Sequence, residues 1–211
     1  MASLPFTNKI TSEVELRTLI GEPTELVIRK QLPVLDAHCR AFIALSPFLL
    51  IGTVGANGLG DVSPRGDPPG FVHVVDEQTL LIPDRPGNRR IDSLRNILQT
   101  GAIGLLFMAP NVEETLRVNG RACLIRDEEW LERMALHGKQ PQLAISVTVE
   151  ECFFQCAKAL KRSRLWQPEH WPARDALPSL AQMLIDQAKP ANTTVEQLEE
   201  YIKESYTKRL Y

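Results

Sequence analysis

The chain of 211 residues is poor in cysteine and aromatic residues and has no large excess of charge of either sign. Its four cysteines are too sparse for a disulfide framework, so we expect reduced thiols at Cys39, Cys123, Cys152 and Cys156. None of the four histidines stands at a metal-ligand spacing from them, and we predict no metal site. With 24 Lys and Arg against 26 Asp and Glu and no basic run, we expect no nucleic-acid partner.

Long apolar runs are also missing. None approaches the roughly 20 residues that span a bilayer, so we expect no membrane segment. Residues 1–13 lack a basic region followed by a long apolar one, which argues against a secretory signal and predicts a cytoplasmic location. Also absent are a Ser-His-Asp order, a Cys-His nucleophile, an HExxH motif, a Walker loop and a Rossmann glycine fingerprint. If the chain is an enzyme, a cofactor therefore carries the chemistry.

The two ends of the chain are predicted to be helical extensions, over residues 1–45 and 167–211. In the first, Ser12 to Glu15 reads as a capping box and Gly21 can end the helix after Ile20; two further helices are expected at 25–30 and 36–45. In the second, a capping box at Thr193 to Glu196 precedes a charged helix that ends near the last residue.

Between these extensions, residues 46–166 show apolar runs of strand length. Strands are predicted at 48–54, 60–65, 71–75, 79–83, 102–108, 114–125 and 143–154, the first two joined by the turn residues Asn57 and Gly58, with helices at about 89–99 and 127–136. Six or seven antiparallel strands with short links favour a mainly β, α+β fold built on a small closed or partly open barrel. Side chains fill so small a barrel, so a ligand would lie at a rim, a groove or a subunit interface.

Residues 80–98 contain the clearest candidate binding site. An apolar strand ends in a turn of Asp, Arg, Pro, Gly and Asn that delivers Arg89 and Arg90 into a predicted helix, with Asn88 suited to cap it. Free N–H groups and the helix dipole favour an anion there, and the two arginines add charge and bidentate donors, so we predict a phosphate site. The alternative is a solvated helix start with surface ion pairs.

Residues 63–70, SPRGDPPG, form a second candidate. Three prolines restrict this stretch and two glycines free it, which predicts a rigid loop that presents Arg65 and Asp67. The loop either contributes ligand contacts or is a connector in which these two side chains pair with each other.

Residues 150–166, EECFFQCAKALKRSRLW, form a third candidate. The segment leaves a strand and carries polar, basic and aromatic side chains that could wall a ligand's ring and phosphate, namely Gln155, Lys158, Arg162, Ser163 and Trp166. The alternative is an amphipathic helix that packs on the core and has one solvated side.

Taken together, the blocks SPRGDPPGF, PDRPGNRRIDSLRN and FFQCAKALKRSRLW resemble the FMN-binding split-barrel flavoproteins of the pyridoxamine 5'-phosphate oxidase type, in a less characterised branch. The resemblance covers about residues 45–166. It implies that Asn88, Arg89 and Arg90 hold the FMN phosphate. It also places two further groups of flavin contacts, at the strand end Ile82, Pro83 and Asp84 and at Ser63, Arg65, Gly66 and Asp67.

The resemblance further implies a homodimer with FMN in grooves at the subunit interface, two FMN per dimer, and side chains of both chains around each flavin. The chemistry implied is hydride or electron transfer through the flavin N5, with Arg65 or Lys158 as candidates near N1. The characteristic Trp and Arg substrate pattern of the biosynthetic oxidase is not matched at the C-terminal end, so a pyridoxamine phosphate substrate is not implied.

The function expected from the sequence is therefore that of an FMN-dependent oxidoreductase acting on an unidentified small molecule. Two alternatives stay open: a flavin-binding or sensing module without turnover, and a split barrel that binds haem or a deazaflavin.

Overall fold

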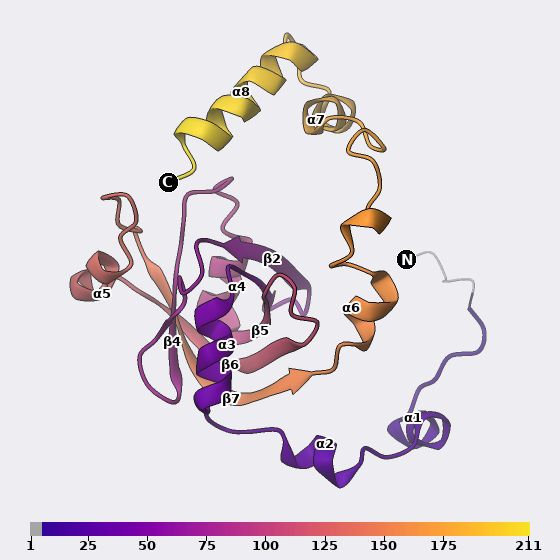
Figure 1. Ribbon diagram of the computed structural model, residues 1–211. Coiled ribbons are helices and arrows are strands. Elements are labelled where there is room, and N and C mark those ends of the chain that lie inside the picture. The colour runs from indigo at the N-terminus through magenta and orange to yellow at the C-terminus, as the bar shows by residue number, and fades with distance from the viewer. Residues whose placement is uncertain (1–5) are drawn as a thin grey trace.

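A single antiparallel sheet of seven strands forms the centre of the computed structural model, which describes residues 6–211 (Figure 1). The strands are β1 (Phe48–Val54), β2 (Gly60–Gly66), β3 (His73–Val74), β4 (Thr79–Pro83), β5 (Ala102–Met108), β6 (Thr115–Ile125) and β7 (Ala144–Gln155), in the sheet order β2-β1-β5-β6-β7-β4-β3. The predicted α+β fold of six or seven antiparallel strands is thus confirmed, with seven strands. Residues 1–5, part of the predicted N-terminal extension and of the stretch read against a secretory signal, lie outside the described residues.

Alternation along the strands builds the core. In β5, Ile103, Leu105 and Phe107 are buried, whereas the residues between them are half-buried on the outer face. The same alternation runs through β1, whose Leu49 and Ile51 are fully buried. Because side chains of a strand alternate between its faces, the curved sheet encloses one apolar cluster.

Two helices cover this cluster. Helix α3 (Ala37–Leu45) buries Cys39, Phe42 and Ile43, and helix α4 (Asp92–Thr100) buries Leu94 and Ile97. Helix α5 (Glu128–Arg133) covers a smaller cluster formed by Leu81, Leu131, Met134 and Ala144. It is shorter than predicted, because residues 136–139 form a turn closed by two backbone hydrogen bonds between Leu136 and Lys139.

The cysteines are free, as expected. Cys39 and Cys152 lie in the core with their Sγ atoms 3.9 Å apart, and Cys123 and Cys156 are exposed. Burial raises the pKa of the Cys39 thiol, so this sulfur stays protonated and packs as a small apolar group.

The remaining helices lie outside the barrel (Figure 1). They are α1 (Glu13–Ile20), α2 (Glu25–Arg29), α6 (Lys158–Ser163), the 3-10 helix η1 (Pro168–His170), α7 (Leu180–Ala188) and α8 (Val195–Lys208). Helix α1 ends at Gly21, as predicted, with a φ of 82°. The second predicted capping box was wrong by one residue, since Thr194 and Gln197 form it. In the parts of these helices that the structure describes, Ala181 of α7 is the only residue that is buried.

The strand predicted at 60–65 is present and extends to Gly66, so the loop predicted at 63–70 was wrong in its first half. Ser63 to Gly66 continue β2 and pair with β1, where Ser63 lies opposite Ile51 and Gly66 opposite Phe48. Pro64 is tolerated because β2 is an edge strand with one hydrogen-bonded neighbour. The strand predicted at 71–75 is likewise reduced to His73–Val74, and Phe71 and Val72 are buried outside the ladder.

Candidate functional site

Strand β2 carries a polar residue at every second position. Asp61, Ser63 and Arg65 are half-buried, whereas the residue that follows each of them is exposed. Because strand side chains alternate, the three polar residues share one face, which is turned toward the segment 84–93 between β4 and α4. Asp67 follows on the same spacing.

Contacts between these residues form what we call the polar seam: Asp61, Ser63, Arg65, Asp67, Asp84, Arg85 and Ser93. Ser93 Oγ donates a hydrogen bond to Asp61 Oδ2 at 2.6 Å. Arg65 donates through Nη1 to Ser63 Oγ at 2.7 Å, and its Nη2 lies 3.7 Å from Asp84 Oδ1. Since β2 is an edge strand, these side-chain contacts join it to the β4–α4 segment in place of a backbone ladder.

The seam settles an alternative that the sequence left open. Arg65 and Asp67 do not pair with each other: Arg65 pairs with Asp84, and Asp67 accepts a hydrogen bond from Arg85 Nε at 2.6 Å. Both ion pairs therefore cross from β2 to the segment that follows β4. The two stretches singled out in the sequence are brought together.

Arg65 has one donor left over. Its Nε is buried and has no hydrogen-bond partner among the described residues, and its side chain is 22% exposed. A buried donor without an acceptor is costly, so this position suits an acceptor supplied by a ligand. Burial raises the pKa of Asp84 beside it, and the Arg65 charge offsets part of that rise.

At the other end of the seam every charge is satisfied. The Asp67 side chain is 1% exposed, and its second oxygen accepts from the Tyr211 hydroxyl at 2.8 Å. Arg85 also donates through Nη2 to the Met134 carbonyl at 2.8 Å. A cavity of about 170 Å³ lies beside this pair, between residues 67–73 and 133–136. Burial, together with Arg133 and Arg85, lowers the pKa of His73 in its wall.

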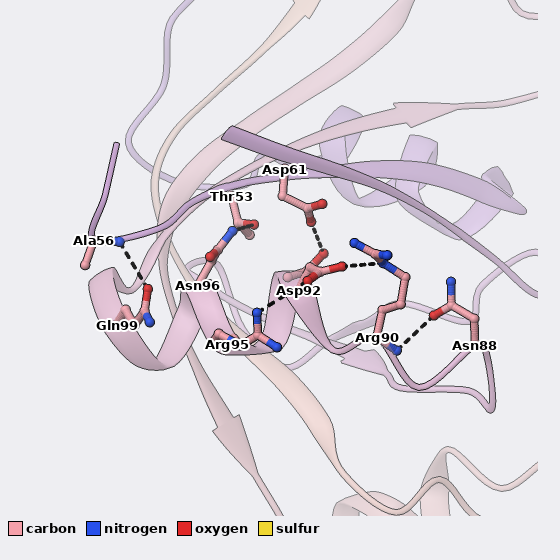
Figure 2. A network of polar contacts seen from close by, with 10 residues as sticks. Thr53, Ala56, Asp61, Asn88, Arg90, Asp92, Arg95, Asn96 and Gln99 are labelled. Atoms are coloured by element: carbon pink, nitrogen blue, oxygen red, sulfur yellow. Dashed lines mark hydrogen bonds and ion pairs between the residues drawn. The ribbon is translucent and has the colours of Figure 1, made fainter. Parts of the chain in front are cut away.

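Residues 88–91 depart from the predicted helix start. Helix α4 begins at Asp92, not near Arg89, because Arg89 and Ile91 adopt left-handed φ values of 61° and 57°. Asn88 does not cap the helix; its Oδ1 accepts from the backbone N–H of Arg90 at 3.0 Å (Figure 2). A left-handed conformation is strained for a β-branched residue, and such strain concentrates at functional sites.

The side chains of Arg89 and Arg90 are both exposed to solvent. Arg89 is exposed and makes no hydrogen bond or ion pair within residues 6–211, and Arg90 pairs with Asp92 at 2.8 Å while 72% exposed (Figure 2). No side chain caps the N-terminus of α4. The arrangement thus offers guanidinium groups and unpaired backbone N–H groups to an anion.

Three more of the predicted contacts lie close by, but none of them brings a polar side chain to the seam. Ile82 and Pro83 are buried in β4, and Ile82, at 0% exposure, belongs to the apolar core. Gly66 is exposed at the end of β2. Asp84 is therefore the member of the predicted strand-end group whose side chain reaches the seam.

The candidate residues of the segment 150–166 are not brought to the seam within one chain. Gln155 Oε1 accepts from Thr115 Oγ1 at 3.2 Å, and Trp166 Nε1 donates to the Val112 carbonyl at 2.9 Å. Lys158 and Arg162 are exposed and make no hydrogen bond or ion pair in the described chain. This second group thus lies at the β5–β6 turn.

A groove of about 460 Å³ crosses the outer face of β2, β1, β5 and β6 and shares Asp61 with the seam. Its floor contains Gly52 and Gly104, which are paired neighbours in the ladder. A Cβ on Gly104 would come within 3.1 Å of Asn119 Oδ1. The absence of side chains here keeps the groove open.

The sequence analysis missed Arg85, Ser93 and Tyr211. No local pattern predicts these three residues, because their partners lie 18, 32 and 144 positions away.

Comparison with known proteins places the fold. The sequence profile of the pyridoxamine 5'-phosphate oxidase family matches residues 35–156, more than half of the chain. The chain belongs to this family. The match begins with the residues that lead into α3 and ends just after β7, so it contains the whole sheet and the whole polar seam.

Solved structures with similar folds share little sequence with this chain. HupZ of Group A Streptococcus is 19% identical, with 56% of this chain and 92% of that chain covered and a TM-score of 0.44. A candidate pyridoxamine 5'-phosphate oxidase from Lactobacillus delbrueckii is 20% identical (59% and 98% covered, TM-score 0.45). An FMN-binding protein from Syntrophomonas wolfei is 10% identical (68% and 96% covered, TM-score 0.43). No curated protein matches the chain.

Membrane-spanning helices and clustered metal ligands are both absent from residues 6–211. No helix there is both long and apolar enough to cross a bilayer. In the same part of the chain, no group of three or more His, Cys, Asp or Glu side chains is arranged to hold a metal ion.

Proposed function

We propose that this protein is an FMN-binding flavoprotein and an FMN-dependent oxidoreductase acting on an unidentified small molecule. Two features at the segment 84–93 carry the proposal. Arg89 and Arg90 are exposed before α4, with Arg89 unpaired among the described residues and Arg90 paired with Asp92. The buried, unpartnered Nε belongs to Arg65, which pairs with Asp84 of the same segment. Membership of the pyridoxamine 5'-phosphate oxidase family supports it.

The residues present fit FMN. Arg89, Arg90 and the uncapped N-terminus of α4 would hold the phosphate, with Asn88 shaping the turn that presents them. Arg65 Nε would donate to an acceptor of the flavin. The groove of about 460 Å³ next to Asp61 falls within the roughly 300–1,000 Å³ typical of ligand sites.

FMN, when bound, supplies hydride or electron transfer through its N5. The chain's own residues bind and orient it. Arg65 places a positive charge on the seam, where it can stabilise negative charge on a reduced ring. Asp84 next to it holds a proton more readily than an exposed carboxyl, since burial raises its pKa.

A homodimer with FMN at the subunit interface completes the proposal. The outer face of β1 and β5 presents apolar side chains that the chain itself leaves partly uncovered, among them Phe48, Leu50, Leu106 and Met108. The groove runs across this face and is open in a single chain. A second copy would close it and would also supply its own Gln155, Lys158, Arg162 and Trp166, which lie away from residues 88–90 of the same chain.

The direct test is FMN binding by the double variant Arg89→Ala/Arg90→Ala. Each hydrogen bond to a charged group is worth about 1.5–3 kcal/mol, so we expect FMN affinity to fall by roughly 100-fold or more. The matched control is Arg40→Ala/Arg174→Ala, which removes two exposed arginines that no carboxylate pairs in the described chain. Fluorescence titration gives the affinity, and sedimentation with flavin absorbance gives the stoichiometry, expected at two FMN per dimer.

Unchanged affinity in the Arg89/Arg90 variant would overturn the phosphate assignment. Release of haem or a deazaflavin from the purified protein would favour the other ligand classes. A protein that binds FMN, yet shows no steady-state turnover with NAD(P)H as the electron donor and a range of electron acceptors, would favour a flavin-binding or sensing module.

A further inference from the structure

The C-terminal arm, residues 171–211, leaves the barrel after α6 and returns to it at its last residue. Figure 1 shows α7 and α8 in an arc outside the sheet that ends next to the segment following β4. At its start, Trp171 bonds to the residues just before the arm. Beyond Trp171, every hydrogen bond and ring contact between this arm and the rest of residues 6–211 is made by Tyr211. The arm is thus tied down at one point.

Four side chains from three separate segments contact Tyr211, and we call them the Tyr211 receptor: Asp67, Arg85, His137 and Lys139. The Tyr211 hydroxyl donates to Asp67 Oδ1 at 2.8 Å, and the ring lies 5.8 Å from the Arg85 guanidinium. The His137 ring meets the Tyr211 ring edge-on at 5.3 Å between centroids, and Lys139 Nζ donates to the Tyr211 carbonyl at 2.8 Å. The acceptor carboxylate of Asp67 is 1% exposed.

The Tyr211 receptor differs from a chance surface contact in two ways: its acceptor Asp67 is buried, and it includes residues of the polar seam. Exposed tyrosines on the same arm, such as Tyr206 at 62% exposure, make no such contacts. Asp67 and Arg85 belong to the polar seam, and they also line the 170 Å³ cavity. Tyr211 therefore contacts two residues that line the cavity, and these two form the ion pair between the end of β2 and the segment that carries Arg89 and Arg90.

We propose that residues 209–211 are a strap that locks the arm on the barrel through Tyr211, and that this lock is coupled to flavin binding through the Asp67–Arg85 pair. When the strap is seated, both oxygens of Asp67 are occupied and the pair is held in place. When it is released, Asp67 keeps one partner, the rim of the cavity opens, and the segment 84–93 loses part of its support. The coupling rests on the proposed function; the strap itself does not.

Coupling between two sites is reciprocal. FMN bound at residues 88–90 stabilises the seated strap, and the seated strap strengthens FMN binding by the same factor. The tyrosine hydroxyl is the group to remove, because Tyr211→Phe keeps the ring contacts and takes away only the bond to Asp67.

The experiment is limited trypsin digestion of the full chain, followed by mass spectrometry of cleavage after Lys208 or Arg209. Without flavin, Tyr211→Phe is expected to be cleaved about tenfold faster than the wild type, the loss expected for one hydrogen bond to a charged group. The matched control Tyr206→Phe, on the same arm, is expected to be cleaved at the wild-type rate. Saturating FMN is expected to slow cleavage of the wild type more than that of Tyr211→Phe, and the FMN dissociation constant of Tyr211→Phe is expected to rise.

Equal cleavage of the wild type and Tyr211→Phe without flavin overturns the strap. Faster cleavage of Tyr211→Phe, together with a wild-type rate that FMN does not change, overturns the coupling and leaves the strap. A wild type that binds no FMN contradicts the proposed function and the coupling, while the flavin-free rates still decide the strap.

Discussion

The Asp67 end of the polar seam and the neighbouring turn at residues 88–91 handle charge in opposite ways. At Asp67 the carboxylate is buried and has two donors, and its partner Arg85 is 16% exposed and bonded again to a backbone carbonyl. At residues 88–91 the arginines are exposed, one is unpaired among the described residues, and the backbone is strained at two positions. The Asp67 end uses its charges within the fold, whereas the turn leaves Arg89 unpaired among the described residues and has two residues with left-handed φ values.

The comparison indicates which charged residues stabilise the fold and which are available to bind a ligand. A buried, fully paired charge is expensive to disturb but has no capacity left for a ligand. Free guanidinium groups on a strained turn add little to stability and are available to an anion. Substitutions at the two ends should therefore differ in the sign and size of their effects on stability.

The largest effect is expected at the satisfied end. Asp67→Ala leaves Arg85 buried without its carboxylate, and breaking a buried pair in this way costs about 3–5 kcal/mol. The free energy of unfolding, from urea titration, should fall by that amount. Asp175→Ala is the control, since Asp175 is exposed and unpaired in the described chain, and should change stability by less than about 0.5 kcal/mol. A loss below about 1 kcal/mol at Asp67 would remove the contrast between the two ends.

The strained end should respond with the opposite sign. Ile91 has a φ of 57°, which costs an L-residue roughly 1–2 kcal/mol and glycine almost nothing. We therefore expect Ile91→Gly to raise the free energy of unfolding by about 1 kcal/mol. Ile28→Gly, at an exposed position inside α2, should lower it by about 1 kcal/mol. Destabilisation by both variants would show that the turn is not strained.

The start of α4 is a feature that local sequence patterns did not predict. The turn before Arg89 reads as a helix entry, because non-glycine residues are expected to avoid left-handed φ values. In the structure the helix begins at Asp92, next to Ser93, whose hydroxyl is bonded to Asp61 of β2 (Figure 2). That contact joins residues 32 positions apart, so no local pattern predicts it.

The sheet was more predictable than the site for the same reason. Strand alternation and the Asn57-Gly58 turn are local signals, and both hold: Gly58 has a φ of 76° in the β1–β2 hairpin. The pairing of Asp67 with Arg85 and Tyr211 depends on how the sheet curves and where the arm returns. Chemistry identified Arg65 and Asp67 as notable residues, but only the fold identified their partners.

The smallest effect is expected in the middle of the seam, at Asp84. Burial raises the pKa of this carboxyl above its ordinary value of 3.8. Between 3.8 and the raised value, the native state binds more protons than the unfolded chain, so the contribution of Asp84 to stability is present at lower pH and is lost as pH rises through the native pKa. Asp84→Asn should remove this loss, and the stability of the variant relative to the wild type should therefore increase from about pH 3.5 to about pH 7 in urea titrations.

Asp76→Asn is the matched control with the opposite sign, because a hydrogen bond from the Gln78 backbone N–H lowers the pKa of Asp76, and its contribution is lost as pH falls. If the two variants changed with pH in the same direction, the Arg65 charge would outweigh burial at Asp84. No change with pH in Asp84→Asn would mean that Asp84 is solvated like an ordinary surface carboxyl. Either result would contradict the prediction.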